Sequence, residues 1–123
     1  MNSYIDDSKV YIDKSEVCEG LGVFAKENIY KGELIERGII TRLINVDGHE
    51  NPHLFTWSDD RTVWGCGSGH LPFYNHDVLG NAKKVGNLDA DILEVVATEF
   101  IPAGTEIMAP YYSKSWRKCF QSF

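Results

Sequence analysis

The sequence has no hydrophobic run that approaches about 18 residues, the shortest length typical of a membrane-spanning helix. We therefore predict no contact with a membrane. Residues 1–14 are polar and acidic, and so lack the apolar segment of a secretory signal. The three cysteines are widely spaced without a C-x-x-C pair, which argues against a zinc ribbon and a disulfide framework. Together these absences predict an intracellular, reducing setting.

Basic residues are scarce relative to acidic ones. The chain has 12 Lys and Arg against 18 Asp and Glu, a formal net charge of −6. This excess repels a phosphate backbone, so we do not expect nucleic acid as a direct partner, whereas a basic peptide or protein tail would be attracted. With 123 residues, 43% hydrophobic and 24% charged, the composition is that of one folded domain.

Long stretches with the 3.6-residue period of a helix are missing, and the chain reads as short strands separated by Gly, Asp, Asn and Pro. We predict a loose N-terminal tail over residues 1–9 and a mostly β domain over residues 10–112. The C-terminal segment, residues 113–123, has helical spacing between Trp116 and Phe120. The predicted strands span residues 10–12, 23–25, 34–43, 54–57, 62–64, 92–98 and 107–109.

One pattern, A-x-E-x-I-x-x-G-x-x-I, begins at Ala25 and again at Ala97. Each copy predicts a strand, then a turn whose glycine takes a positive φ, then a second strand. Ile29 and Ile101 would fill the base of the two turns. Two copies are too few for a solenoid, and unless the similarity is accidental they indicate two similar corners of one compact fold.

Three segments could carry chemistry, and each has an ordinary structural explanation when taken alone. Residues 20–22 (Gly-Leu-Gly) let the backbone approach a ligand closely, but they also suit a tight turn. Residues 73–77 (Phe-Tyr-Asn-His-Asp) suit an Asx turn, although the polar pair beside an aromatic wall needs partners that a polar ligand could supply. The third segment, residues 104–112, ends in two tyrosines, which are usually packing residues.

Other catalytic signatures are missing. Residues 65–69 (Gly-Cys-Gly-Ser-Gly) resemble a phosphate loop only loosely, because the Lys-Ser/Thr step is absent. No G-x-S-x-G elbow occurs. The four histidines and three cysteines have no H-x-x-H or C-x-x-H spacing, so we predict no metal site.

Taken together and in this order, the segments resemble the SET domain of protein lysine methyltransferases, over most of the chain from Val10 to Trp116. Residues 20–25 are similar to the family's G-x-G-[VL]-[FY]-A, and residues 29–36 to I-x-x-G-E-x-I-x-E. Residues 73–77 match F-x-N-H-S, with Asn81 near the Asn of the following P-N. Residues 101–107 and Tyr111 match I-x-x-G-E-E-[IL]-x-x-x-Y. The likeness is greatest to the minimal SET proteins of viruses and bacteria.

The resemblance implies a β-clip fold, in which several small sheets surround a knot-like crossing of the Asn-His segment and the loop with the final tyrosine. It implies S-adenosyl-L-methionine as the cofactor and a lysine on a protein or peptide, such as a histone or another basic protein, as the target. The location would be the cytoplasm, or the compartments of a host cell for a viral protein. Tyr111 would be the catalytic residue. The implied cofactor-binding residues are Gly20, Leu21, Gly22, Asn75, His76, Tyr111 and Trp116.

The resemblance also suggests where the target lysine enters, and where this chain departs from the family. The implied substrate-binding residues are Leu54, Phe55, Tyr74 and Tyr112. Asp77 replaces the usual Ser, which either changes only the surface or alters the hydrogen bonds that close the crossing. Ala109 and Ser115 are small where relatives have aromatic residues, so the number of methyl groups transferred stays open.

Two alternative functions remain at this point. One is a binding module that has the same fold with little or no turnover. The other is an unrelated small β protein that interacts through its aromatic residues. The assembly is also open, because a monomer and a homodimer are equally compatible with a chain that lacks the family's flanking segments. The cysteine-rich flanks that bind zinc in larger relatives are absent, and this again predicts no zinc.

Overall fold

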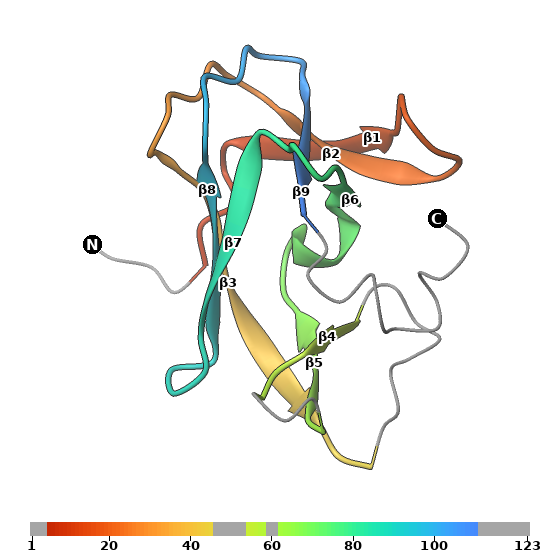
Figure 1. Ribbon diagram of the computed structural model, residues 1–123, viewed down its shortest axis with the longest axis vertical. Helices are drawn as coiled ribbons and strands as arrows, with labels where there is room; N and C mark the ends of the chain where they lie inside the picture. The colour runs from red at the N-terminus through yellow and green to blue at the C-terminus, as the bar shows by residue number, and fades with distance from the viewer. Residues whose placement is uncertain (1–4, 46–53, 59–61, 111–123) are drawn as a thin grey trace.

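The computed structural model describes residues 5–45, 54–58 and 62–110, and this part of the chain is built almost entirely from strands (Figure 1). The prediction of a mostly β fold with several small sheets and little helix is confirmed. In the described residues the helical structure is one short turn, η1, and no helix there could cross a membrane. In chain order the elements are β1 (Val10–Lys14), β2 (Leu21–Ala25), β3 (Leu34–Leu43), β4 (Leu54–Thr56), β5 (Trp64–Gly67), η1 (Leu71–Phe73), β6 (Asn75–His76), β7 (Ala82–Asn87), β8 (Ile92–Ala97) and β9 (Glu106–Ala109).

The strands form two sheets. One has the order β1-β2-β9-β6, and the other has the order β4-β5-β3-β8-β7. The first sheet lies at the upper end of Figure 1, and the long β3 runs from there toward β4 and β5. Every neighbouring pair is antiparallel except β6 and β9, which are parallel. This exception brings together two segments that are distant in the sequence.

The core follows from the alternation of side chains along β8. Leu93, Val95 and Ala97 are buried, whereas the residues between them are partly exposed. Successive strand residues point to opposite faces, so this strand buries one face and offers the other to solvent. The prediction of a strand over residues 92–98 is confirmed, with its end at Ala97.

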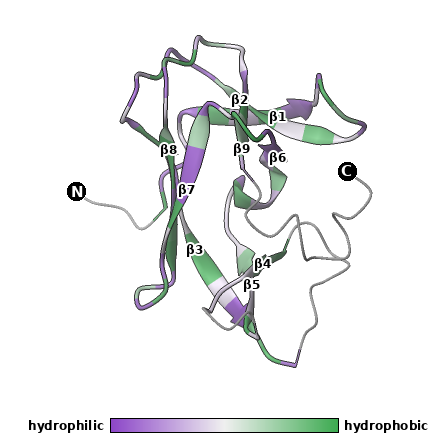
Figure 2. Cartoon of the chain, viewed as in Figure 1, coloured by the Kyte–Doolittle hydropathy of each residue, from purple (hydrophilic) through white to green (hydrophobic). Residues whose placement is uncertain are grey.

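Strand β7 was not predicted, because Lys83 and Lys84 interrupt any hydrophobic alternation there. Figure 2 shows the middle of this strand as hydrophilic. In the described part of the chain β7 lies at the edge of its sheet and pairs with β8. Charged side chains are favoured at such an edge because they discourage pairing with another chain.

Strand β5 begins at Trp64, where the predicted strand over residues 62–64 was expected to end. The strand continues as far as Gly67. Residues 65 and 67 are glycines because neighbouring side chains leave no space there for a Cβ. A Cβ at Gly67 would lie 2.7 Å from the Cβ of Leu71, and one at Gly65 would overlap the Ile40 side chain. The first three residues of the glycine-rich stretch that loosely resembles a phosphate loop are therefore part of a closely packed strand, and Ser68 and Gly69 follow it.

The two copies of the repeated pattern pair with each other. Ile29 and Ile101 exchange both backbone hydrogen bonds, at 2.9 and 2.8 Å, and both are fully buried. In each copy the turn glycine donates its N–H to the first alanine of the other copy, at 2.8 Å in both cases. Gly32 and Gly104 have φ values of 86° and 84°, as the turn prediction required. The repeat thus produces two equivalent corners that lock together.

The described part of the predicted N-terminal tail is attached to β3. Asp6 and Arg37 exchange backbone hydrogen bonds of 2.8 Å in each direction. The Nζ of Lys9 lies 3.2 Å from the Glu33 carboxylate and also donates to the carbonyl oxygen of Leu34. Residues 5–9 therefore extend the fold along β3 instead of forming a loose tail.

Asp91 fastens the β7–β8 turn to the rest of the larger sheet. It accepts hydrogen bonds from Arg42 Nε at 2.9 Å and Trp57 Nε1 at 2.8 Å, which lower the pKa of its carboxyl. A lowered pKa in the folded state adds stability at neutral pH that is lost as the pH falls below about 3.8, the ordinary value.

We expect Asp91→Asn to be less stable than wild type at pH 7, with the difference shrinking toward pH 3. Urea unfolding at several pH values measures this, and Asp89→Asn, on the same turn, should show no such trend.

Candidate functional site

The candidate site begins where β6 lies beside β9. Asn75 is opposite Met108, and His76 is opposite Ala109. Tyr111 follows Ala109 by two positions in the sequence. The resemblance predicts that the Asn-His segment lies beside the strand that precedes Tyr111. The structure confirms this as far as Ala109. Three predicted site residues, Tyr111, Tyr112 and Trp116, lie outside the described residues.

The side chain of Asn75 connects strand β2 to the paired strands β6 and β9. Its Nδ2 donates to the carbonyl oxygen of Leu21 at 3.0 Å and to the Glu106 carboxylate at 2.8 Å. These two bonds use both hydrogens of the amide, so the group left to meet a ligand is the acceptor Oδ1. Residues 20–22 and Asn75, predicted separately as ligand contacts, are thus held side by side.

Glu106 is the centre of this arrangement. Its carboxylate is 5% exposed and accepts hydrogen bonds from the Ser15 hydroxyl at 2.9 and 3.0 Å, from the backbone N–H of Glu16 at 3.1 Å and from Asn75. A buried charge requires such donors to offset its lost hydration. The network therefore fixes the loop after β1, the strand β9 and the Asn75 side chain relative to one another.

Gly22 is required by this network. A Cβ at this position would overlap the Glu106 carboxylate and lie 3.1 Å from Asn75 Nδ2. Gly20 differs, because its φ of 117° requires a glycine, yet nothing lies within 4 Å of where its Cβ would be. The first glycine therefore leaves open space beside the backbone, and the second admits the buried carboxylate.

Asn81 holds β9 from the other side. Its Nδ2 donates to the Glu106 carbonyl oxygen at 3.0 Å, and its Oδ1 accepts from the Met108 N–H at 2.9 Å. The Asn81 amide thus makes the two backbone hydrogen bonds with β9 that a neighbouring strand would otherwise make. Asp77 is not part of these contacts, because its Oδ1 accepts from the Leu79 N–H at 2.9 Å in a local Asx turn.

The predicted substrate contacts have different surroundings. Leu54 and Phe55 lie half-buried in β4 of the other sheet, where the Lys84 Nζ is 4.9 Å from the centre of the Phe55 ring. Tyr74 is 1% exposed and donates its hydroxyl to Glu36 at 2.7 Å. The structure therefore places Tyr74 in the core, where a substrate side chain cannot reach its ring.

Glu36 and Tyr74 are both affected by this burial. Desolvation raises the pKa of the Glu36 carboxyl, although hydrogen bonds from Tyr74 and from the His70 N–H oppose the change. The pKa of the Tyr74 hydroxyl is raised as well, first by burial and then by the neighbouring carboxylate. The sequence analysis gave Glu36 and Glu106 no role of their own. The available signal was that Glu36 lies beside an isoleucine within a predicted strand and Glu106 directly precedes another, at places where a charged residue needs partners.

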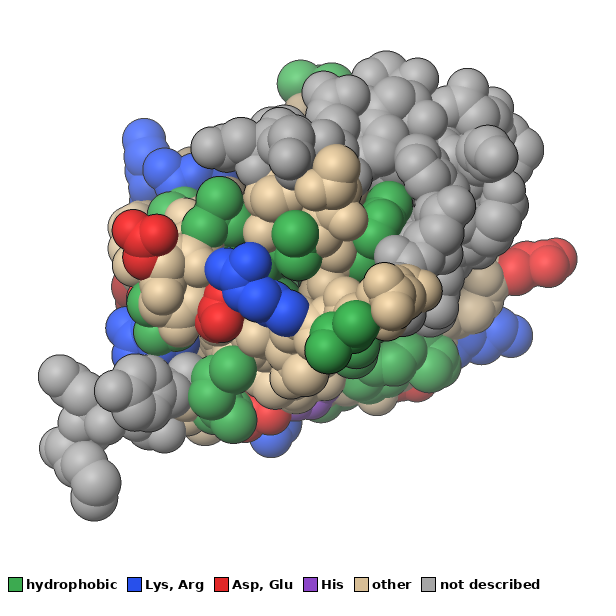
Figure 3. Space-filling view, turned by 90° about the horizontal axis from the view of Figure 1, so that it is seen from below, with side chains coloured by type: hydrophobic (Ala, Val, Ile, Leu, Met, Phe, Trp, Pro, Cys, Tyr) green, Lys and Arg blue, Asp and Glu red, His purple; other side chains and the backbone are tan. Residues whose placement is uncertain are grey.

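Charged side chains of both signs are mixed with hydrophobic ones on the face seen from below (Figure 3). The described side chains visible there do not gather into one area of a single sign.

A family model for the SET domain matches residues 20–112, which include all the strands of the candidate site. The chain belongs to the SET-domain family. The glycine pair, the Asn-His strand and the Glu106 strand described above all fall within the matched range. No curated protein sequence matches the chain.

Several solved structures share this SET fold. A Plasmodium falciparum protein assigned as a histone methyltransferase is 28% identical, with a TM-score of 0.71 over 84% of this chain and 92% of that one. A chain of an active polycomb repressive complex 2 in its basal state is 25% identical, with a TM-score of 0.70 over 84% of this chain. A Chaetomium thermophilum complex of the same kind, bound to an inhibitor, is 24% identical with a TM-score of 0.69 over 85%. This chain spans only 15% of each polycomb chain.

Proposed function

We propose that this SET domain transfers a methyl group from S-adenosyl-L-methionine to the side-chain amine of a lysine on a protein. The observation that carries the proposal is the parallel pairing of β6 with β9, which sets Asn75 beside the strand that leads to Tyr111. Support also comes from a polycomb repressive complex 2, 23% identical with a TM-score of 0.67, whose structure is bound to S-adenosylmethionine.

The described residues fit the methionine end of this cofactor. The ammonium group of the cofactor is a donor, and Asn75 Oδ1 is the acceptor left over after Nδ2 has bonded to Leu21 and Glu106. Gly20 leaves open space beside its backbone for close approach. His76 would contribute its backbone, and Trp116 would stack on the adenine, which typically adds about 1–3 kcal/mol.

When bound, S-adenosylmethionine supplies a methyl group activated by a positively charged sulfur. The protein must present an uncharged lysine, whose ordinary pKa is about 10.4, and a channel with little water lowers that pKa. Tyr111 would orient the reacting groups through its hydroxyl. Such positioning can remove roughly 7–11 kcal/mol of a barrier, so the reaction needs no covalent intermediate with the enzyme.

The experiment compares wild type with Tyr111→Phe. Wild type should bind S-adenosylmethionine in calorimetry and transfer labelled methyl groups to histones or other basic proteins. Tyr111→Phe should retain most of the binding, while kcat falls by about 10²-fold, because only the orientation of the reacting groups is lost. Tyr30→Phe is a matched control, since Tyr30 is exposed and its ring contacts that of Phe100 in a tilted arrangement, with the centroids 5.1 Å apart.

Two results would contradict the proposal. If wild type produces no heat and no thermal shift with S-adenosylmethionine, the chain does not use this cofactor. If it binds the cofactor yet labels no basic protein, it is a binding module of the same fold. Unchanged activity in Tyr111→Phe would remove Tyr111 from the mechanism.

A further inference from the structure

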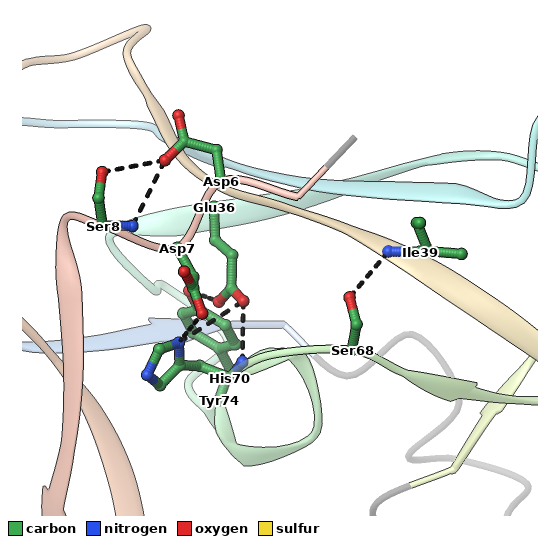
Figure 4. Close-up of polar contacts among 8 residues, drawn as sticks. All are labelled: Asp6, Asp7, Ser8, Glu36, Ile39, Ser68, His70 and Tyr74. Atoms are coloured by element: carbon green, nitrogen blue, oxygen red, sulfur yellow. Dashed lines mark hydrogen bonds and ion pairs between the residues drawn. The ribbon is translucent and has the colours of Figure 1, made fainter. Parts of the chain in front are cut away.

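Three ligand-type side chains from distant segments of the chain meet close to η1. They are Asp7 in the segment before β1, Glu36 in β3, and His70 just before η1 (Figure 4). His70 Nδ1 lies 3.4 Å from Asp7 Oδ2 and 3.7 Å from Glu36 Oε2. With one ligand atom taken from each residue, the three atoms lie within 4.8 Å of one another.

His70 Nδ1 points at this gap without a hydrogen bond. The atom is buried from solvent, and no donor or acceptor within hydrogen-bond criteria pairs with it. Buried polar atoms in folded proteins nearly always have a partner, so an orphaned imidazole nitrogen between two carboxylates indicates a ligand that it would bind. Imidazole nitrogen is also the commonest metal ligand in proteins.

A glycine forms one wall of the gap. A Cβ at Gly69 would lie 2.6 Å from Glu36 Oε2 and 3.2 Å from Asp7 Oδ2, so any larger residue would occupy the space beside both oxygens. Gly69 has a φ of 58°, which other residues adopt less readily. Gly69 therefore adds no side-chain atom beside these two carboxylate oxygens.

The spacing suits a metal ion. Zn²⁺ binds His nitrogen and carboxylate oxygen at about 2.0–2.2 Å, and tetrahedral ligands at that length are about 3.3–3.6 Å apart. Two of the observed separations, 3.4 and 3.7 Å, are already close to this range. A small inward movement of Asp7, whose side chain is 42% exposed, would complete the triangle.

The charge balance also favours a cation. The Glu36 side chain is 0% exposed, and its two neutral donors, the Tyr74 hydroxyl and the His70 N–H, do not neutralise it. Asp7 brings a second carboxylate to the same place. Two carboxylates that face each other in a partly desolvated pocket repel, and a divalent ion between them removes that repulsion.

We propose that Asp7, Glu36 and His70 bind a divalent transition-metal ion of the Zn²⁺ class, with water at the remaining position. One nitrogen and two carboxylate oxygens are a donor set typical of such ions. The ion joins the N-terminal segment, β3 and the turn that leads into β6, and so it stabilises the approach to Asn75. The site contains no cysteine and is separate from the proposed methyl-transfer site. Sequence spacing predicted no metal site because the three ligands come from three distant segments.

The test measures metal binding directly. Wild-type protein freed of metal with EDTA is titrated with Zn²⁺ by calorimetry and heated with and without the ion. A free Zn²⁺ concentration of about 100 times Kd should raise Tm by about 10 °C. The Co²⁺ complex should show d–d absorption without the charge-transfer band of a thiolate, which excludes binding by the exposed Cys18 and Cys66.

Two substitutions locate the ion. Asp7→Asn and His70→Gln should each weaken Zn²⁺ binding by at least about tenfold. Asp6→Asn is the matched control, because Asp6 is the adjacent acid but accepts from Ser8 instead of facing His70, and it should keep the wild-type affinity. Asp7→Asn changes a half-exposed side chain, and its circular dichroism without metal should match wild type. Absence of a Zn²⁺ effect on wild type, or equal affinity in Asp7→Asn and Asp6→Asn, would overturn the proposal.

Discussion

Glu106→Gln should weaken the binding of S-adenosylmethionine by about 10–100-fold and lower the free energy of unfolding by about 3 kcal/mol. Both oxygens of Glu106 accept hydrogen bonds from donors, and Gln replaces one oxygen with an NH₂ group that faces those donors. Hydrogen bonds to a charged group contribute about 1.5–3 kcal/mol each, and a buried donor left without an acceptor adds its desolvation cost. Asn75 would then lose the contact that orients its Oδ1.

Calorimetry with S-adenosylmethionine and urea unfolding measure the two effects separately. Glu99→Gln makes the same chemical change at an exposed position and should alter neither. If Glu106→Gln unfolds more easily but binds the cofactor normally, the network is structural only. Asn75 would then not be the residue that receives the ammonium group of the cofactor.

Ile101→Ala is expected to lower the free energy of unfolding by about 2–5 kcal/mol, and Ile29→Ala by a similar amount. Both side chains are 0% exposed, and each occupies the same position in one of the paired corners. Removing buried methylene and methyl groups costs their transfer free energy together with the cavity left behind. Because the corners bond to each other, the double substitution should cost less than the sum of the two single ones.

Urea unfolding of the two single variants and the double variant gives the coupling energy. Ile44→Ala is the matched control, since Ile44 is 86% exposed and should change stability by no more than about 0.5 kcal/mol. A large difference between the two single variants would show that the corners are not energetically equivalent, despite their matching hydrogen bonds.

Much of the fold could be predicted from the sequence where local pattern and burial agree. The residues of β3 include several β-branched strand formers, among them Ile35, Ile39 and Ile40, and the predicted bounds match those observed. The turn glycines Gly32 and Gly104 were recognisable because a positive φ strongly selects glycine. β7 was missed because an edge strand tolerates charges that conceal its period.

The candidate site was predictable only in part. Asn75 and the glycine pair could be identified because they lie in motifs that follow the same order along the chain as in the SET family. The Glu106 network and the Asp7–Glu36–His70 cluster depend on contacts between segments far apart in the sequence, and no local spacing records them. The resemblance suggested Tyr74 as a substrate contact, and the sequence carries no sign that its hydroxyl would be buried against Glu36.

Two pairings between distant parts of the sequence, Ile29 with Ile101 and β2 with β9, determine when this chain can complete its fold during synthesis. The β1–β2 hairpin is local and can form early, but its open edge pairs with β9, near the end of the described chain. Contacts between residues so distant in sequence close slowly, because the loop between them must lose its freedom first. Folding of this domain therefore waits until β9 has been synthesised, and until then the hairpin edge is exposed to chaperones and to neighbouring nascent chains.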